Sequence, residues 1–504
     1  MRNSNSVRIF DFSGGLKSNT SAVSIDIDSA SDLQNINILP EGSFSARLGN
    51  TVFNSTAMVS GSTPISGLGY FRKSDLTDAL VSVAGTKFFT SASLSGTMTD
   101  STGAITITSG QNKLWTFTPM NDFIIGVGGA PDAPFTWNGT GNAGALGGSP
   151  PSGNFGIQGN NYMFIGNTTA NPSRIAWSIF GNPADWSGTG SGNQDVSKND
   201  GDTLVGASVM SNDQMLLFKQ NSIHSLIIRN PPFPIFPLFR GAGAVSKRGI
   251  VNADGIVYFI TPQPRMKATD GNQIVDFPDT IDDVWDGLSQ AQLANLHGIY
   301  NPVKRQIWWF VSNGSSTTHN LCIVWDLVRK CWLRHTTGYG MNASVRAKDY
   351  LIYGGAYDGK CYKQDAATTY SDASESSPGS INSYWRSGWI DFRRMINSKT
   401  IPYIDVSFLS KSTGTFDISY GFDFLPDRSI VSVSLLAPGN KWNQFLWGIG
   451  RWGGQSNTNK TIFTKGSGKF VQFFIRHNSA TEGFTFNGME VPVKQGQSSI
   501  IKTA

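Results

Sequence analysis

The sequence predicts an all-β protein, a β-propeller of about seven blades followed by an antiparallel β-sandwich-like domain. Short runs of aromatic and β-branched residues recur between polar turns, which is typical of strands. Successive runs start roughly 40 to 50 residues apart, the period of a propeller blade, and six to eight blades fit. After residue 380, apolar and polar residues alternate strictly, as in strands with one buried face. The charged fraction of 15% and the 56 glycines favour a turn-rich β chain over a helical bundle.

The clearest repeat unit lies in residues 300–365, which contain about one and a half copies of a four-strand pattern. Runs at 307–311 and 321–325 predict two strands, and the polar residues 326–330 predict the turn into a third. Asp358-Gly359 favours a hairpin, because glycine accepts the positive φ of such a turn. Comparable apolar cores occur at 79–83, 123–127, 162–165, 215–218, 256–260, 307–310 and 351–353. A single hairpin cannot bury its own face, so we expect radial packing of the repeats.

The pattern divides the chain into four parts. Residues 1–50 differ from the repeats and are expected to close the propeller or to make contacts, and residues 51–365 form the propeller. Residues 366–380 are rich in Ser, Ala and Thr and predict an exposed linker that limited proteolysis should cut. Residues 381–504 are expected to form the separate C-terminal β-domain.

Bulk properties exclude several classes of protein. Three cysteines, with no CxxC pair, predict no disulfide framework and synthesis in a reducing compartment. No apolar run approaches the length needed to span a bilayer, and the first residues lack the apolar region of a secretory signal. The net charge of +5 is small for 504 residues and does not argue for nucleic-acid binding.

Motifs for chemistry are weak throughout. The five histidines show no metal-ligand spacing. Residues 354–360 fit GxxxxGK, but Cys361 replaces the Ser or Thr that would hold magnesium, and the context is strand-turn-strand. We therefore expect no catalytic residue, no cofactor-binding residue and no metal ligand.

Two clusters leave alternatives open. Four carboxylates at 279–286 fit a calcium site, a glycosidase pair, or a short helix with acids near its N-terminus. Trp308, Trp309 and Trp325 fit either sugar stacking or blade core, and their strand positions favour core.

Residues 231–239 interrupt the repeat pattern with four prolines, which remove backbone donors and exclude a central strand. The segment packs between blades or contacts a partner subunit. The candidate interface residues are Pro231, Phe233, Phe236 and Phe239.

The N-terminal segment carries a family resemblance. Its motif is Phe-x-Gly-Gly-Leu, then Leu-x-Asn, a glycine turn and Arg-x-Gly. The matching positions are Phe12, Gly14, Gly15, Leu16, Asn35, Gly42, Arg47 and Gly49. This pattern resembles the tail nozzle or hub proteins of short-tailed bacteriophages, the tail tubular protein B-like family. Looser matches at 172–186, 241–259 and 470–491 extend the resemblance over most of the chain.

The resemblance implies a structural virion protein at the distal end of a short phage tail. It implies a ring of six subunits with a central channel for genome ejection, and attachment sites for tail fibres or an adaptor. Duplex DNA would pass without sequence-specific binding, and the protein would be made in the host cytoplasm. The alternative is a propeller that binds or cleaves glycans in receptor recognition. The lack of Ser-x-Asp-x-Gly-x-Thr-Trp boxes, an acid pair and a secretion signal favours the nozzle or hub reading.

Overall fold

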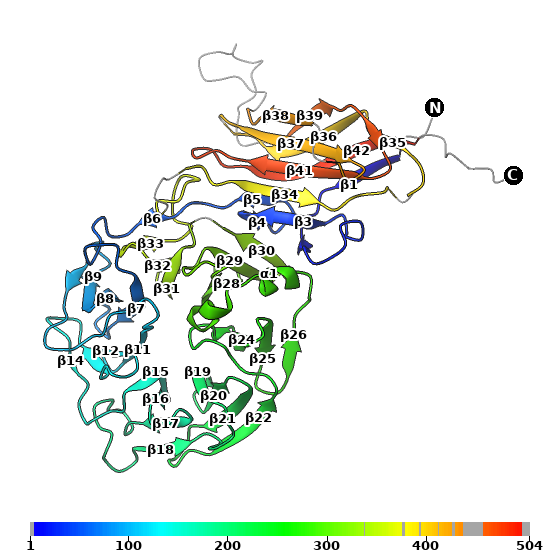
Figure 1. Ribbon diagram of the computed structural model, residues 1–504. Helices are drawn as coiled ribbons and strands as arrows, with labels where there is room; N and C mark the ends of the chain where they lie inside the picture. The colour runs from blue at the N-terminus through cyan, green and yellow to red at the C-terminus, as the bar shows by residue number, and fades with distance from the viewer. Residues whose placement is uncertain are drawn as a thin grey trace.

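The computed structural model describes residues 5–336, 338–374, 379–392, 395–411, 413–425, 429–436 and 457–495. Within them, seven four-stranded antiparallel sheets stand around a ring, and two larger sheets lie beside its rim (Figure 1). The prediction of an all-β chain with a propeller of about seven blades and an additional β-domain is confirmed.

The first six blades are built from consecutive strands. The first blade contains β7 (Ile65–Arg72), β8 (Asp78–Ala84), β9 (Lys87–Ala92) and β10 (Thr99–Asp100), and the second contains β11 (Thr116–Met120), β12 (Phe123–Val127), β13 (Phe135–Trp137) and β14 (Gly144–Ala145). The third blade contains β15 (Gly153–Gly159), β16 (Tyr162–Thr168), β17 (Arg174–Trp177) and β18 (Gly192–Asp195), and the fourth contains β19 (Leu204–Ser211), β20 (Gln214–Lys219), β21 (Ser222–Ile227) and β22 (Ile235–Arg240). The fifth blade contains β23 (Val251–Ala253), β24 (Ile256–Ile260), β25 (Met266–Thr269) and β26 (Ile274–Asp276), and the sixth contains β27 (His297–Asn301), β28 (Gln306–Val311), β29 (Leu321–Asp326) and β30 (Cys331–His335).

The sixth blade shows why these runs are so apolar. Every residue of β28 and β29 is buried, because neighbouring blades cover both faces of the blade. Trp308 and Trp309 pair with Val324 and Ile323 across the two strands, so these tryptophans belong to the core. Asp326 makes the predicted turn: its Oδ1 accepts the backbone N–H groups of residues 328 and 329 at 3.0 and 2.9 Å.

The seventh blade closes the ring with a strand from the other end of the propeller. It combines β31 (Met341–Arg346), β32 (Ile352–Ala356) and β33 (Cys361–Lys363) with β6 (Thr51–Val52). Val52 lies opposite Tyr362 in the antiparallel pair. The last blade therefore cannot be completed before the chain entering the first blade is in place.

The two larger sheets draw strands from both ends of the chain. One contains β1 (Asn5–Ile9), β4 (Ile36–Ile38), β5 (Phe44–Ala46), β35 (Lys399–Thr400), β36 (Tyr403–Leu409), β39 (Asn457–Phe463), β40 (Ser467–Gly468) and β42 (Thr485–Gln495). The other contains β2 (Gly15–Leu16), β3 (Ser29–Gln34), β34 (Ser383–Ser387), β37 (Thr415–Phe422), β38 (Ser429–Ser434) and β41 (Val471–His477). We call this pair of sheets the sandwich.

The sandwich differs from the expectation of a separate C-terminal domain. Strand β1 pairs with β42 over five residue pairs, and β3 pairs with β34, so residues 5–46 are integral to it. The 1–50 segment thus does not itself close the propeller; β6 does. Residues 39–43 form the turn of the β4–β5 hairpin, which contains the motif residue Gly42. The propeller is in effect an insertion between two halves of the sandwich.

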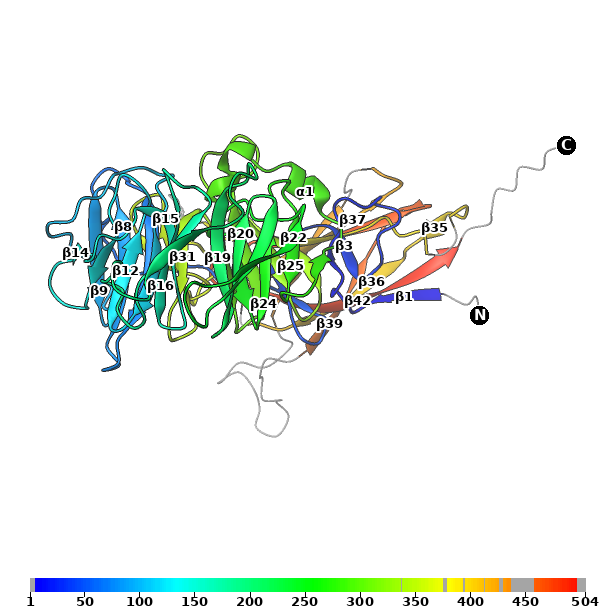
Figure 2. The same cartoon turned by 90° about the horizontal axis from the view of Figure 1, so that it is seen from below.

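The sandwich lies against the rim of the propeller beside the sixth and seventh blades (Figures 1 and 2). Strand β30, the last of the sixth blade, contacts β2, β3 and β4 of the sandwich. A short helix, α1 (Asp282–Asp286), and a 3-10 turn, η1 (Gln290–Asn295), connect the fifth and sixth blades.

Buried histidines give the fold a dependence on pH. Burial lowers the pKa of His477 from 6.5 to about 4 and that of His319 to about 3. In the unfolded chain these histidines bind protons near pH 6.5, whereas in the folded chain they stay neutral until the pH is much lower. The free energy of unfolding should therefore fall as the pH drops from about 6.5 to 4. Urea unfolding at several pH values measures this. His477→Gln should flatten the dependence, and an unchanged slope would contradict the assignment.

Candidate functional site: the junction of propeller and sandwich

The chain crosses between sandwich and propeller twice, and the two crossings run side by side. Residues 47–50 leave the sandwich, and residues 367–374 return to it. The N–H of Gly49 donates to the carbonyl of Thr369, and the carbonyl of Gly49 accepts from Ala367, both at 3.1 Å. A Cβ at Gly49 would lie 1.8 Å from the carbonyl oxygen of Ser371, so only glycine fits this approach.

A buried ion pair joins the crossings. The side chains of Arg47 and Asp372 are each 1% exposed. Arg47 Nη1 donates to Asp372 Oδ1 at 3.0 Å, and Nη2 donates to Oδ2, a bidentate arrangement. The guanidinium also lies 4.9 Å from the ring centre of Tyr339. Asp372 accepts a further bond from the N–H of Asn50 at 3.1 Å, so both charges are satisfied inside the protein.

Asn35 ties the propeller to the sandwich. Its N–H donates to the carbonyl of Arg334 at 2.9 Å, and its Oδ1 accepts from the N–H of Thr336 at 3.1 Å, both at the end of β30. On the sandwich side, its Nδ2 donates to the carbonyl of Asn382 at 3.0 Å. Its Oδ1 also accepts from Arg47 Nε at 3.2 Å. The residue has φ of 55°, a backbone that asparagine tolerates better than most residues.

Of the remaining motif residues, Phe12 lies inside the sandwich, whereas Gly15 and Leu16 lie in β2 next to the propeller. Phe12 packs edge-on against Phe44 and Trp385, with ring centres 4.9 and 5.0 Å apart. Gly15, with φ of 63°, lies so close to β30 that a Cβ would be 2.7 Å from the carbonyl oxygen of Trp332. Leu16 is buried beside it.

Two glycines complete the motif in the same region. Gly14 lies against the side chain of Ser29. The carbonyl of Gly42 accepts a hydrogen bond from the N–H of Phe12 at 2.9 Å. Five of the eight motif residues therefore lie at the junction of propeller and sandwich, namely Gly15, Leu16, Asn35, Arg47 and Gly49, whereas Phe12, Gly14 and Gly42 lie within the sandwich. Sequence reasoning missed its partners Asp372, Tyr339 and Trp385, because nothing local marks them.

The segment predicted as an exposed linker is in large part this returning crossing. Ala367 and Asp372 are buried, and Tyr370 and Ile381 are hydrogen-bonded through their backbones. Small polar composition suggested exposure, but here small residues allow close packing of two backbones. Residues 375–378 lie outside the described residues.

The proline-rich segment is divided between core and surface. Phe233 is 1% exposed and packs on Trp177 and Tyr162 of the third blade at 4.9 and 5.0 Å, which corrects the expectation that it is available to a partner. Phe236 is 54% exposed, and Pro231 and Phe239 are half-buried. Pro237 lies in β22, the edge strand of the fourth blade, consistent with the exclusion of a central strand.

The other residues that the sequence singled out lie in regular elements of the propeller or between its blades. The acidic cluster forms α1, where Arg265 pairs with Asp282 at 3.0 Å and with Asp286 at 2.9 Å. Gly354 and Gly355 lie in β32, followed by a turn and β33, which is no phosphate loop.

The described part of the chain contains no group of three or more His, Cys, Asp or Glu residues placed to hold a metal ion. No helix among the described residues is long and apolar enough to cross a membrane.

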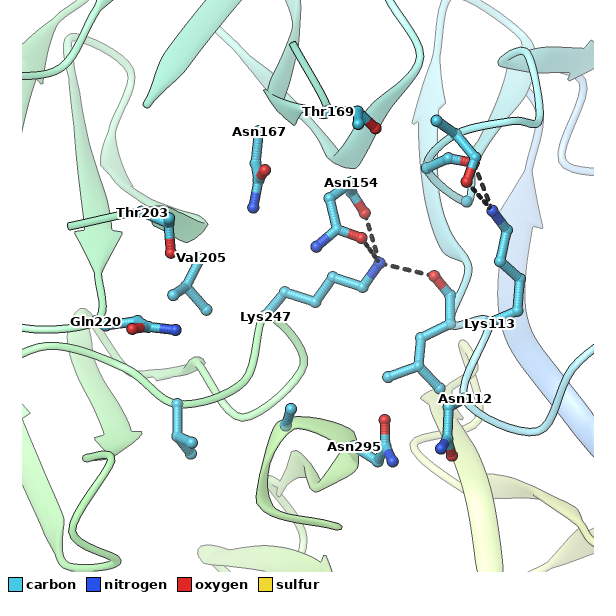
Figure 3. Close-up of a pocket in the computed structure, with 16 residues that line it drawn as sticks. Asn112, Lys113, Asn154, Asn167, Thr169, Thr203, Val205, Gln220, Lys247 and Asn295 are labelled. Atoms are coloured by element: carbon cyan, nitrogen blue, oxygen red, sulfur yellow. Dashed lines mark hydrogen bonds between the residues drawn. The ribbon is translucent and has the colours of Figure 1, made fainter. Parts of the chain in front are cut away.

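A polar cavity of about 420 Å³ lies where the inner strands of several blades converge (Figure 3). Lys247, between the fourth and fifth blades, reaches across it (Figure 3). Its Nζ donates to the carbonyls of Leu114 and Asn154 at 2.7 and 2.5 Å, and to Asn154 Oδ1 at 3.0 Å. The side chain therefore bridges the second and third blades across the middle of the propeller.

The comparisons with known proteins find similarity only among solved structures. No family model matches the chain, and no curated protein sequence matches it. Among solved structures, YCF48 from Cyanidioschyzon merolae is similar over 63% of this chain and 98% of its own, with 11% identity and a TM-score of 0.41. The WD40 β-propeller domain of Doa1 covers 63% of this chain and 96% of its own, with 10% identity and a TM-score of 0.37. A chain of the mitotic checkpoint complex covers 66% and 97%, with 11% identity and a TM-score of 0.42.

Proposed function

We propose that this protein is a structural component of a short phage tail, of the nozzle or hub type, that assembles into a closed ring around a channel for DNA. The observation that carries the proposal is the convergence of the resemblance motif on the propeller–sandwich junction. Gly15, Asn35 and Arg47 are scattered in sequence, but all three lie at the contact that holds the propeller and the sandwich in a fixed orientation. A ring subunit needs such rigidity, because any hinge between its bodies would spoil closure.

The sandwich offers surface for contacts between subunits. Its two sheets end in β38 and β39, which stand at the end of the sandwich far from the propeller (Figure 1). These edge strands carry Ile430, 70% exposed, and Phe463, 81% exposed. Open edges with large apolar side chains are a liability in a monomer and are normally covered. Phe236 on the propeller is a further exposed candidate.

The channel for DNA would lie between subunits. Lys247 crosses the middle of the propeller and bonds to carbonyls on the far side of the cavity, so the subunit's own axis does not provide a passage for duplex DNA. Six copies, the number that the resemblance implies, would enclose the channel, and tail fibres or an adaptor would bind the outside. Duplex DNA would slide past without sequence-specific contacts, since tight phosphate binding would hinder ejection.

Electron microscopy of the purified protein, alone and mixed with a cognate tail adaptor, tests this proposal. We expect a closed sixfold ring whose passage admits duplex DNA. Ile430→Ser with Phe463→Ser should reduce ring formation at least tenfold while the far-UV circular dichroism of the subunit stays unchanged. Val303→Ser, at an exposed propeller site, is the matched control.

Two outcomes would contradict the proposal. One is a protein that stays monomeric with the adaptor and is absent from purified tails. The other is saturable binding or cleavage of host glycans by such a monomer, which would favour the receptor-recognition alternative.

A further inference from the structure

Arg248 stands next to Lys247 but lacks comparable partners. Its Nη1 lies 3.5 Å from the carbonyl of Ser66, and its Nη2 lies 3.4 Å from the carbonyl of Asn295, both long for charge-assisted bonds. Its buried Nε has no hydrogen-bond partner among the residues that the structure describes. Among the described residues, no carboxylate forms an ion pair with it. A partly buried cation held this loosely is costly unless an anion completes its surroundings.

Arg248 is one of the residues that line a second cavity, of about 350 Å³, on the inner strands of the propeller. Its lining residues come from four blades and include Thr116, His297, Ser344 and Arg346. None of the described residues that line it is an Asp or a Glu. His297 Nε2 lies 2.9 Å from Ser344 Oγ, while its Nδ1 is buried without a partner. The cavity therefore combines two arginines and neutral donors with no negative charge.

We propose that this cavity binds a small oxyanion, a phosphate or a carboxylate, with Arg248 as its principal donor. A guanidinium presents paired N–H groups in the geometry that both kinds of oxyanion accept. Arg346 supplies a second positive charge, and the hydroxyl of Ser344 supplies a further hydrogen bond. Lys247 is excluded as a ligand, because its three bonds to protein oxygens leave it no free donor.

The electrostatics of the site agree with this assignment. Burial lowers the pKa of Arg248 to about 10, although a guanidinium ordinarily keeps its proton well above that. An oxyanion beside it would offset the desolvation and raise the pKa again. The inference does not depend on the proposed role in a phage tail, because it concerns one subunit.

The test is calorimetric titration of the full-length protein with inorganic phosphate and, separately, with acetate, at constant ionic strength kept by potassium chloride. We expect saturable binding of at least one of them, with one site per chain. Arg248→Gln should weaken it at least about tenfold, as expected for loss of a charge-assisted pair. Arg229→Gln, an exposed arginine loosely paired with Asp213 at 3.5 Å, is the matched control and should bind like the wild type.

Two further variants keep the test decisive if Arg248→Gln folds poorly. Arg248→Lys keeps the positive charge but loses the paired N–H groups of the guanidinium, so this variant should bind the oxyanion several-fold more weakly. Arg346→Gln changes an exposed side chain that lines the cavity and should weaken binding without altering the unfolding transition. Absence of saturable binding of both probes to the wild type would overturn the proposal, as would wild-type affinity in the folded Arg248 and Arg346 variants.

Discussion

Replacing Arg47 by Met is expected to destabilise the protein by about 3 to 5 kcal/mol, because the carboxylate of Asp372 would remain buried without its partner. Asp372→Asn should have a comparable cost, since it leaves the guanidinium uncompensated. The double variant Arg47→Met/Asp372→Leu should cost clearly less than the sum, because neither charge is then stranded. Urea unfolding followed by tryptophan fluorescence measures all three.

The matched control for this pair is an ion pair on the surface of the same sandwich. Arg8 and Glu490 lie 3.1 Å apart with side chains 72% and 32% exposed. Arg8→Ala should change the free energy of unfolding by no more than about 1 kcal/mol, since solvent screens such pairs. A similar small effect for Arg47→Met would mean that the junction does not depend on its buried charges.

The second large effect is expected at Phe233. Phe233→Ala should destabilise the propeller by about 3 to 5 kcal/mol, because it empties a site enclosed by Trp177, Tyr162 and Phe164. Phe236→Ala, three residues away and exposed, should change stability by less than about 0.5 kcal/mol. Thermal or urea unfolding of the two variants separates core from surface within one segment.

The pair also tests the role of the segment in assembly. If Phe236 contacts a neighbouring subunit, Phe236→Ala should shift the monomer–ring equilibrium in sedimentation experiments while the unfolding transition stays in place. A stable Phe233→Ala variant would contradict the core assignment. Unchanged assembly of Phe236→Ala would limit subunit contacts to the sandwich edges or other surfaces.

The junction explains how an inserted propeller can act as one body with its sandwich. The two crossings form backbone hydrogen bonds to each other through Gly49, and the ion pair between Arg47 and Asp372 holds them together. Asn35 adds bonds to the sixth blade and to the sandwich at once. Force or displacement applied to the sandwich would therefore reach the propeller through several short contacts.

The sequence by itself determined the local structure and the repeat. Strands such as β28 and β29 are runs of aromatic and β-branched residues, and their turn is set by Asp326, whose carboxylate bonds to the backbone two and three residues ahead. Each of these features depends on neighbours within a few positions. Their regular spacing was enough to predict about seven blades.

Only the tertiary structure decided how the ends of the chain combine and which residues meet there. Nothing near Asp372 in sequence indicates that it is buried, since its partner Arg47 lies 325 positions away. Phe233 and Phe236 have similar local sequence, yet one fills a gap against the third blade and the other is exposed. Strand pairing and burial depend on contacts between distant segments, whereas periodicity records only which face of each segment is apolar.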